Sequence, residues 1–331
     1  MREWSRLIGA GVIGCAVSIL FPFMTTAQEP AEEQRPRIEL SAGTWFSVGD
    51  TRWAHNASSV PGLGNPTSKL TYKDVGTTVL DLTAKAWVSP RVFGRLNFGY
   101  AGIGGGRLTD DDFGSNGGQR LFSRTNSDLS GDSMWYLNAD SGFRIAEYPN
   151  HRGWLDVFGG YQFWHTKYEA TGVTQVACDP SAIPGLSPCA PAGASGFQGQ
   201  TVITNTTNWH SIRVGASTEY RLTRRLSVLG TLALIPISVV DNNDVHHLRG
   251  DLKQDPSFSM VGYVVGTDVD VGARFMITNN LAANLGYRLY YNRVVSGDLT
   301  IHHVAGSSDS FPLTQFESLR HGFTASLSLI F

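Results

Sequence analysis

The chain has 331 residues with a formal net charge of −2 at pH 7; 16% of the residues are charged, against about 25% in typical soluble domains. A nearly neutral chain lacks the basic patch that nucleic-acid binding requires, so we expect no nucleic-acid partner. The length suits one large all-β domain or two smaller ones.

The N-terminal segment has the pattern of a secretory signal peptide. Two arginines precede an apolar run over residues 7–24, and small residues offer a cleavage site after Ala27. A transmembrane helix is one alternative because the run is nearly long enough to span a bilayer. Lipoprotein acylation at Cys15 is another, although apolar residues continue well past it. We therefore expect a signal peptide over 1–27 and an exported chain over 28–331.

Two-residue alternation of apolar and polar side chains recurs along the whole exported chain, and no segment shows sustained helical periodicity. The C-terminal residues show it well, with Phe323, Leu327 and Phe331 on one face and Thr324 and Ser328 on the other. Similar segments predict ten strands near residues 37–50, 69–88, 92–104, 133–146, 153–169, 206–221, 225–240, 257–276, 281–296 and 316–331.

The polar face of these strands favours a membrane barrel over a soluble β-sandwich. It alternates very small residues with single charges of both signs, which can pair across a narrow lumen. The other face is almost wholly apolar, as a lipid-facing wall must be, and a closed barrel satisfies every backbone group in lipid. The charged residues are Asp81, Lys85, Arg95, Asp140, Arg144, Arg213, Glu219, Asp268, Asp270, Arg274 and Arg288.

We therefore predict an all-β, antiparallel up-and-down transmembrane β-barrel of about ten strands in the Gram-negative outer membrane. Short and long connections alternate strictly, so the long loops share one end, which by the usual asymmetry faces outside the cell. So small a barrel has room for side chains but not for a wide pore, which argues against a general porin. The expected long loops are 51–68, 105–132, 170–205, 241–256 and 297–315.

Two of these loops carry clusters of ionisable residues, Asp110 and Asp112 in the second, and Asp244 and His246 in the fourth. Residues two apart in an extended chain point the same way, and the two loops follow strands on opposite walls. The pairs can therefore face each other across the barrel mouth. A histidine beside a carboxylate is a general base near neutral pH, and two close carboxyls cannot both ionise freely. Together they could deprotonate a water for attack on a peptide carbonyl.

Other interpretations of the outer loops remain open. Aspartates on exposed loops are usually solvated surface. Paired histidines could bind a metal, but they lack helical or cysteine spacing, so we expect none; they are His246, His247, His302 and His303. Cys178 and Cys189 can form a disulfide that staples the third loop. An adhesin or receptor using that loop, or a narrow small-solute channel, are the rival functions.

At these residues the chain resembles the omptins, ten-stranded outer-membrane proteases. Residues 105–113 (GGRLTDDDF) are similar to the omptin Gly-Gly stretch followed by D-x-D and an aromatic residue. Residues 242–246 (NNDVH) are similar to the omptin D-N-D-x-H stretch. Shorter similarities occur at residues 40–44, 160–162 and 291–294, so the resemblance spans most of the exported chain, thinly.

The resemblance implies a monomeric, aspartic-type endopeptidase with its active site facing outside the cell. Asp110 and Asp112 would bind and polarise the water, His246 would act as the base, and Asp244 would orient His246. Peptides or proteins would be the substrates, and no cofactor is implied beyond lipopolysaccharide as an activator.

The chain departs from the omptin pattern at the substrate pocket, where omptins use acidic groups and cut beside basic residues. Asn242 stands where an acid is expected, with Asp241 adjacent, and the expected strand-one glutamate falls near Thr51, with Asp50 beside it. Asp50 and Asp241 are therefore the candidate substrate-binding residues.

A second departure concerns lipid. The resemblance implies contact with outer-membrane lipid and with lipopolysaccharide, which omptins bind through charged residues on the outer wall. In the corresponding strand this chain has Phe163 and His165 where the family carries an acid and an arginine. Dependence on lipopolysaccharide therefore does not follow from these residues.

Overall fold

Antiparallel strands form almost all of the computed structural model, which describes residues 38–114, 120–183, 185 and 189–331. The expected signal peptide lies outside these residues. No helix in the described part is long and apolar enough to cross a membrane. Its elements are β1 (Ile38–His55), β2 (Leu63–Trp87), β3 (Val92–Gly102), β4 (Arg107–Gly114), β5 (Arg120–Leu129), β6 (Ser133–Glu147), η1 (Pro149–His151), β7 (Gly153–Cys178), η2 (Pro180–Ala182), β8 (Ser195–Arg221), β9 (Leu226–His246), β10 (Phe258–Met276), β11 (Leu281–His302) and β12 (Ser308–Ile330).

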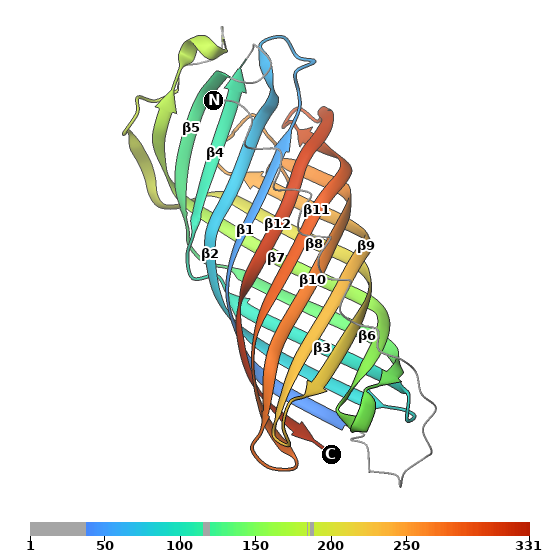
Figure 1. Cartoon of the computed structure of the whole chain (residues 1–331). Helices are drawn as coiled ribbons and strands as arrows, with labels where there is room; N and C mark the ends of the chain where they lie inside the picture. The colour runs from blue at the N-terminus through green and yellow to red at the C-terminus, as the bar shows by residue number, and fades with distance from the viewer. Residues whose placement is uncertain (1–37, 115–119, 184, 186–188) are drawn as a thin grey trace, which may run out of the picture. The chain divides into compact units, whose positions relative to one another are not determined.

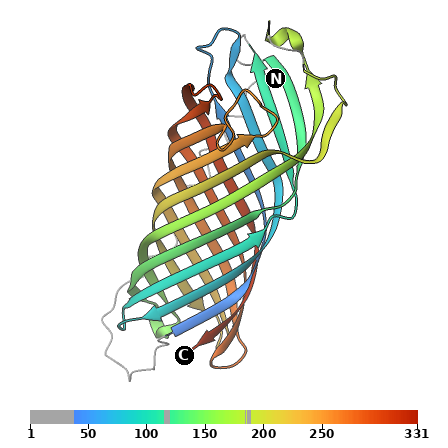
Figure 2. The same ribbon diagram turned by 180° about the vertical axis from the view of Figure 1, so that it is seen from behind.

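Ten of these strands pair in a ring. β1 pairs with β12, the last strand, on one side and with β2 on the other. The series continues through β3, β6 and β7, and then in chain order to β12. Each member thus has two antiparallel neighbours, as a strand in lipid requires. The ring, seen from two sides in Figures 1 and 2, confirms the predicted antiparallel barrel.

The prediction that residues 105–132 form a loop is wrong, because they contain the β4–β5 hairpin. β4 pairs with the first half of β2, and β5 pairs with the last part of β7. Towards its N-terminus, β2 therefore pairs with β4 instead of β3. A second circuit of ten strands, in which β4 and β5 take the places of β3 and β6, continues the barrel. We call this part, formed by β4, β5 and the strand ends beside them, the extension.

Strands also enter the other expected long loops, and the chemistry of the extension explains why the sequence pattern did not show it. On the outer face of the extension, side chains form ion pairs: Arg52 with Glu317 at 3.2 Å, and Lys167 with Asp132 at 2.5 Å. A strand whose outward face meets water does not need apolar side chains at every second position. The sequence of these segments therefore resembles that of polar loops.

The outer wall of the ring is apolar instead. Large side chains such as Phe46, Leu80, Leu96 and Phe323 are between 53% and 69% exposed on it. Apolar area of this kind belongs in hydrocarbon, whereas the charged outer face of the extension does not. The ring is therefore the membrane-spanning part, and the extension projects beyond the bilayer.

Ion pairs fill the lumen of the ring, as the sequence predicts. Arg288 lies 2.6 Å from Asp81 and 2.9 Å from Asp270, and Arg213 reaches Asp140 and Asp268 at 3.5 and 3.3 Å. All eleven charges of the polar face take part in such pairs; the remaining ones are Lys85, Arg95, Arg144, Glu219 and Arg274.

Stacked aromatic rings fill the lumen as well. Trp164 stacks on Tyr136 with ring centroids 4.8 Å apart and on Tyr290 at 4.2 Å, and Trp45 packs edge-on against Trp164 at 6.1 Å. All four rings are at most 5% exposed. The lumen is therefore packed with side chains, as expected for a barrel of this size.

Candidate active site

β4 directs Asp110 and Asp112 toward the interior of the extension. Both lie on the same face of the strand as Leu108, which is 1% exposed. Asp111, between them, points outward and pairs with Arg124 of β5 at 2.5 Å. Pairing with β2 places Asp110 opposite Leu70, so the carboxyls stand above a buried apolar surface.

The end of β9 supplies the other two candidate residues. Asp244 is completely buried, and its Oδ2 accepts a hydrogen bond of 3.0 Å from Asn205 Nδ2 of β8. His246 Nε2 lies 3.7 Å from Asp244 Oδ1, and its ring packs edge-on against Phe258, with centroids 4.6 Å apart. Ser257 Oγ accepts a 3.0 Å hydrogen bond from the His246 backbone N–H, which fixes the strand end.

The two pairs lie close enough to influence each other electrostatically, although their strands are third and seventh in the circuit of the extension. Burial raises the pKa of Asp110 well above its usual value, and the neighbouring carboxyls of Asp112 and Asp244 raise it further. Tyr72 of β2, which is fully buried, also has its pKa raised by burial and then by both Asp244 and Asp110. Asp110, Asp112 and Asp244 therefore lie near one another, and His246 lies beside Asp244.

Burial drives these groups toward their neutral forms. It raises the pKa of Asp244 to about 7 and that of Asp112 to about 6, against hydrogen bonds from Asn205 and Ser68 respectively. Burial, together with the nearby positive charge of Arg249, lowers the pKa of His246 to about 3. At neutral pH the imidazole is therefore uncharged and free to accept a proton, while two carboxyls titrate near neutrality.

Two buried polar atoms at the site face each other without a hydrogen bond. Asp244 Oδ1 and His246 Nε2 have no hydrogen-bond partner among the described residues. An unsatisfied buried polar atom costs about 1–3 kcal/mol, and such atoms are retained where they have a task. The 3.7 Å between them exceeds a hydrogen bond, so a small rotation of the imidazole would join them.

The structure does not bring Asp50 and Asp241 to this site, and their assignment as substrate-binding residues is corrected. Asp50 points outward, where its Oδ1 accepts a 2.9 Å hydrogen bond from the backbone N–H of Asp74. Asp241 lies on the outward face of β9. Because side chains alternate along a strand, the inward positions beside them belong to Thr51 and Asn242, which are 3% and 0% exposed.

Sequence reasoning missed the amides that support Asp244. Asn205 and Asn242 exchange hydrogen bonds of 3.0 and 3.3 Å, and Asn242 Nδ2 donates to Thr207 Oγ1 at 2.7 Å. All are fully buried. The predicted strand began at residue 206, one position too late to include Asn205. The two-residue spacing of Asn205 and Thr207 could have indicated that both side chains point inward.

The remaining candidate groups lie around the site. Cys178 and Cys189 form a disulfide, and Cys178 is paired in register with Ser123 of β5. No group of three or more His, Cys, Asp or Glu side chains is arranged to hold a metal ion within the described ranges. His247, His302 and His303 line a separate pocket.

Comparison with solved structures places the fold among outer-membrane β-barrels. The crystal structure of the outer membrane protease OmpT from Escherichia coli is similar over 89% of this chain and 96% of that one, with a TM-score of 0.69 and 16% identity. The translocator domain of the autotransporter NalP from Neisseria meningitidis covers 91% of this chain and 90% of its own at a TM-score of 0.36 and 10% identity. No family model and no curated protein matches the chain. The resemblance to the omptins thus extends to the fold.

Proposed function

We propose that this chain is an outer-membrane endopeptidase whose active site, formed by Asp110, Asp112, Asp244 and His246, faces outside the cell. The observation that carries the proposal is that both residue pairs face the interior of the extension, one on β4 and the other, with its acid and imidazole 3.7 Å apart, at the end of β9. Spaced acid and acid–imidazole pairs directed at one site are the groups needed to activate a water. The omptin-like fold and the D-x-D and D-x-H spacings support the same chemistry.

The proposed reaction is a direct attack of water on the peptide carbonyl. Asp112 accepts one hydrogen bond from the water, and uncharged His246 takes its other proton as the oxygen bonds to carbon. Asp244 orients the imidazole and stabilises the imidazolium that forms. Asp110, whose pKa is raised by burial and by the neighbouring carboxyls of Asp112 and Asp244, helps Asp112 to hold and polarise the same water. His246 then returns its proton to the leaving amine, so no covalent intermediate forms.

The residues beneath the site do not favour a basic substrate side chain. Thr51 and Asn242 are neutral, and Arg320 of β12 lies one inward position beyond Thr51 along the wall. The Arg320 guanidinium donates to Ser47 Oγ and Thr77 Oγ1 at 3.1 and 2.8 Å, and no carboxylate pairs with it in the part that the structure describes. A lysine or arginine entering from above would approach this positive charge, so we expect cleavage beside neutral residues.

Conduction is not favoured, because ion pairs and stacked rings fill the lumen. Adhesion through the third loop needs no catalytic pair and is the alternative that an absence of cleavage would favour. The test is incubation of refolded wild-type protein, with lipopolysaccharide supplied, with a diverse peptide library read by mass spectrometry. Internal cleavage that disappears in Asp110→Asn supports the proposal, and no cleavage of any member overturns it.

A further inference from the structure

Trp53 of β1 lies between the two halves of the candidate site. Its side chain is 1% exposed and points into the extension. In register, Trp53 is opposite Leu70 of β2, which is in turn opposite Asp110 of β4. The Trp53 ring packs edge-on against Phe258 of β10, with centroids 6.4 Å apart, and Phe258 is opposite Asp244 of β9. One indole therefore connects the wall that carries Asp110 with the wall that carries Asp244.

The polar group of this indole is complementary to an atom of the site. Trp53 Nε1 and Asp244 Oδ1 are both buried, and neither has a hydrogen-bond partner among the described residues. An indole N–H can only donate, and an ionised carboxylate can only accept. Asp244 Oδ2 already accepts a hydrogen bond of 3.0 Å from Asn205 Nδ2, so Oδ1 is the oxygen left for a second donor. The Trp53 N–H also favours the charged form of Asp244, against the burial that raises the pKa of this carboxyl to about 7.

From this arrangement we infer that Trp53 is a positioning residue of the site, whose indole N–H donates to Asp244 Oδ1 when that carboxyl is charged. With Asn205 on one oxygen and Trp53 on the other, the carboxylate is fixed beside His246, whose Nε2 lies 3.7 Å from Oδ1. A carboxylate oxygen accepts more than one hydrogen bond, so Trp53 and His246 do not compete for it. The inference rests on the proposed peptide-cleaving function but concerns the carboxylate that orients the base.

The other side chains around Asp244 leave Trp53 as the donor for this oxygen. Asn205 of β8 is already bonded to Oδ2, and Phe258 of β10 has no polar group. His55 of β1 packs against Trp53 with centroids 6.2 Å apart, and burial lowers its pKa to about 4, so it is uncharged near neutral pH. The other ionisable groups around the site are Asp110, Asp112, Tyr72, His246 and Arg249.

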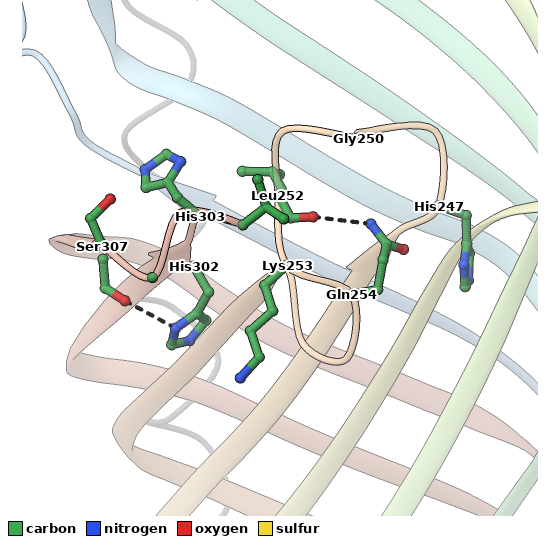
Figure 3. Close-up of a pocket in the computed structure, with 11 residues that line it drawn as sticks. His247, Gly250, Leu252, Lys253, Gln254, His302, His303 and Ser307 are labelled. Carbon is green, nitrogen blue, oxygen red and sulfur yellow. Dashed lines mark hydrogen bonds between the residues drawn. The ribbon is translucent and has the colours of Figure 1, made fainter.

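The imidazoles of His247 and His302 belong to a different surface. They are hydrogen-bonded to Thr204 at 2.9 Å and to Ser259 at 2.8 Å respectively. Both hydroxyl residues alternate with inward-facing neighbours along their strands and therefore point outward. Figure 3 shows the two histidines in the lining of a pocket of about 570 Å³, which the β9–β10 and β11–β12 loops form. These imidazoles therefore do not contact the Asp244 carboxyl.

The experiment compares refolded wild-type protein with Trp53→Phe, which keeps an aromatic ring against Phe258 but removes the N–H. The ionisation of Asp244 is followed by infrared spectroscopy of its carboxyl band, identified by the loss of that band in Asp244→Asn. Trp53→Phe should raise the pKa of Asp244 by about one pKa unit, as expected when a charged group loses one hydrogen bond. The matched control is Trp45→Phe on the same face of β1, where Nε1 is also buried and unpaired among the described residues but lies in the lumen of the ring. It should leave the band unchanged.

Cleavage supplies a second readout, because the proposed reaction needs the charged form of Asp244. If the pKa is raised as expected, kcat/KM of Trp53→Phe should be about tenfold lower than that of wild type at pH 6, and within about twofold of it at pH 9. A side chain that only fills space would lower kcat/KM equally at both pH values when it is trimmed.

Tryptophan fluorescence tests the same contact without any substitution of Trp53. Emission of the wild-type protein should change with a midpoint near pH 7 as the neighbouring carboxyl ionises, and this change should be absent in Asp244→Asn. An emission change that survives in Asp244→Asn would overturn the inference. So would an Asp244 band that titrates at the same pH in Trp53→Phe as in wild type, even if the protein cleaves peptides. Conversely, a band shift confined to Trp53→Phe in a protein that cleaves no peptide would reject the peptidase while retaining the contact.

Discussion

At the scale of single residues, burial sets the chemistry of the site. Asp244 and His246 are enclosed by β8, β10 and the amide pair Asn205–Asn242, and their pKa values move in opposite directions for the same reason: each charged form loses water. A neutral imidazole beside a carboxyl that ionises near pH 7 is suited to accept a proton only when that carboxyl is charged.

The first prediction concerns the pH dependence of cleavage. Asp112 and Asp244 must be ionised in the proposed reaction, and their pKa values are raised to about 6 and about 7. kcat/KM should therefore rise with pH through this window, and be at least about tenfold lower at pH 5 than at pH 8. A fixed neutral peptide assayed in lipopolysaccharide-containing micelles gives the profile. A flat or falling profile between pH 5 and 8 would contradict the assignment.

The second prediction concerns stability at the same residue. A carboxyl whose folded pKa is raised stabilises the folded state in its protonated form, and that contribution is lost as pH rises through about 7. Asp244→Asn should therefore stabilise the extension at pH 8, by up to about 4 kcal/mol for a shift of about three pKa units, and much less at pH 4. Thermal unfolding followed by tryptophan fluorescence measures this. Outward Asp241→Asn is the control, and a lower Tm for Asp244→Asn at pH 8 would refute the account.

At the scale of elements, the β4–β5 hairpin places half of the site. β4 is attached to β2, and β5 to the end of β7, where Cys178 pairs in register with Ser123. The disulfide to Cys189 lies against β5, with Cys189 Sγ 3.5 Å from the carbonyl oxygen of Phe122. The position of Asp110 and Asp112 thus depends on how firmly β5 is held.

The third prediction is that Cys178→Ser combined with Cys189→Ser leaves the barrel folded but lowers kcat/KM several-fold, since the segment that lies against β5 loses its covalent cross-link. Limited proteolysis should cut the hairpin faster, and far-ultraviolet circular dichroism should be unchanged. Full activity together with unchanged proteolysis would show that β2 alone positions β4.

Prediction from sequence succeeded and failed at this scale for one reason. Strands such as β12 face lipid on one side, so Phe323 and Leu327 alternate with small polar residues and reveal the strand. β4 and β5 face water outside, where Asp111 pairs with Arg124, so they carry no such pattern. The spacing of Asp110 and Asp112 was informative because it depends only on extended backbone. The assignment of Asp50 and Asp241 was wrong because sequence similarity indicated their approximate position along the chain but not which face of the strand they occupy.

At the scale of the whole molecule, the ring supplies stability and the extension supplies chemistry. In the lumen of the ring, the eleven charges of the polar face are each paired with one or more opposite charges, which allows polar side chains to fill a barrel that spans lipid. The signs of the charges could be read from sequence, whereas the partners depend on the register of strands far apart in the chain, such as Asp81 and Arg288.

The fourth prediction follows from this division. Arg288→Ala leaves Asp81 and Asp270 without their shared partner, and breaking such a buried pair typically costs about 3–5 kcal/mol. Urea unfolding should show the loss, while kcat/KM of the folded fraction should stay within about twofold of wild type because the ring, not the site, is altered. Arg91→Ala, in an exposed turn, is the control. A large loss of kcat/KM in folded protein would argue against the separation of ring and extension.

The most direct test of the central claim is a double-mutant cycle between the two walls of the extension. If Asp110 and His246 act on the same water, Asp110→Asn and His246→Ala should each lower kcat/KM by at least about 100-fold. The double variant should then be scarcely slower than either single one, because the shared step has already been lost. Losses that multiply, giving about 10⁴-fold for the double variant, would show that the two residues act independently and would contradict a shared catalytic water.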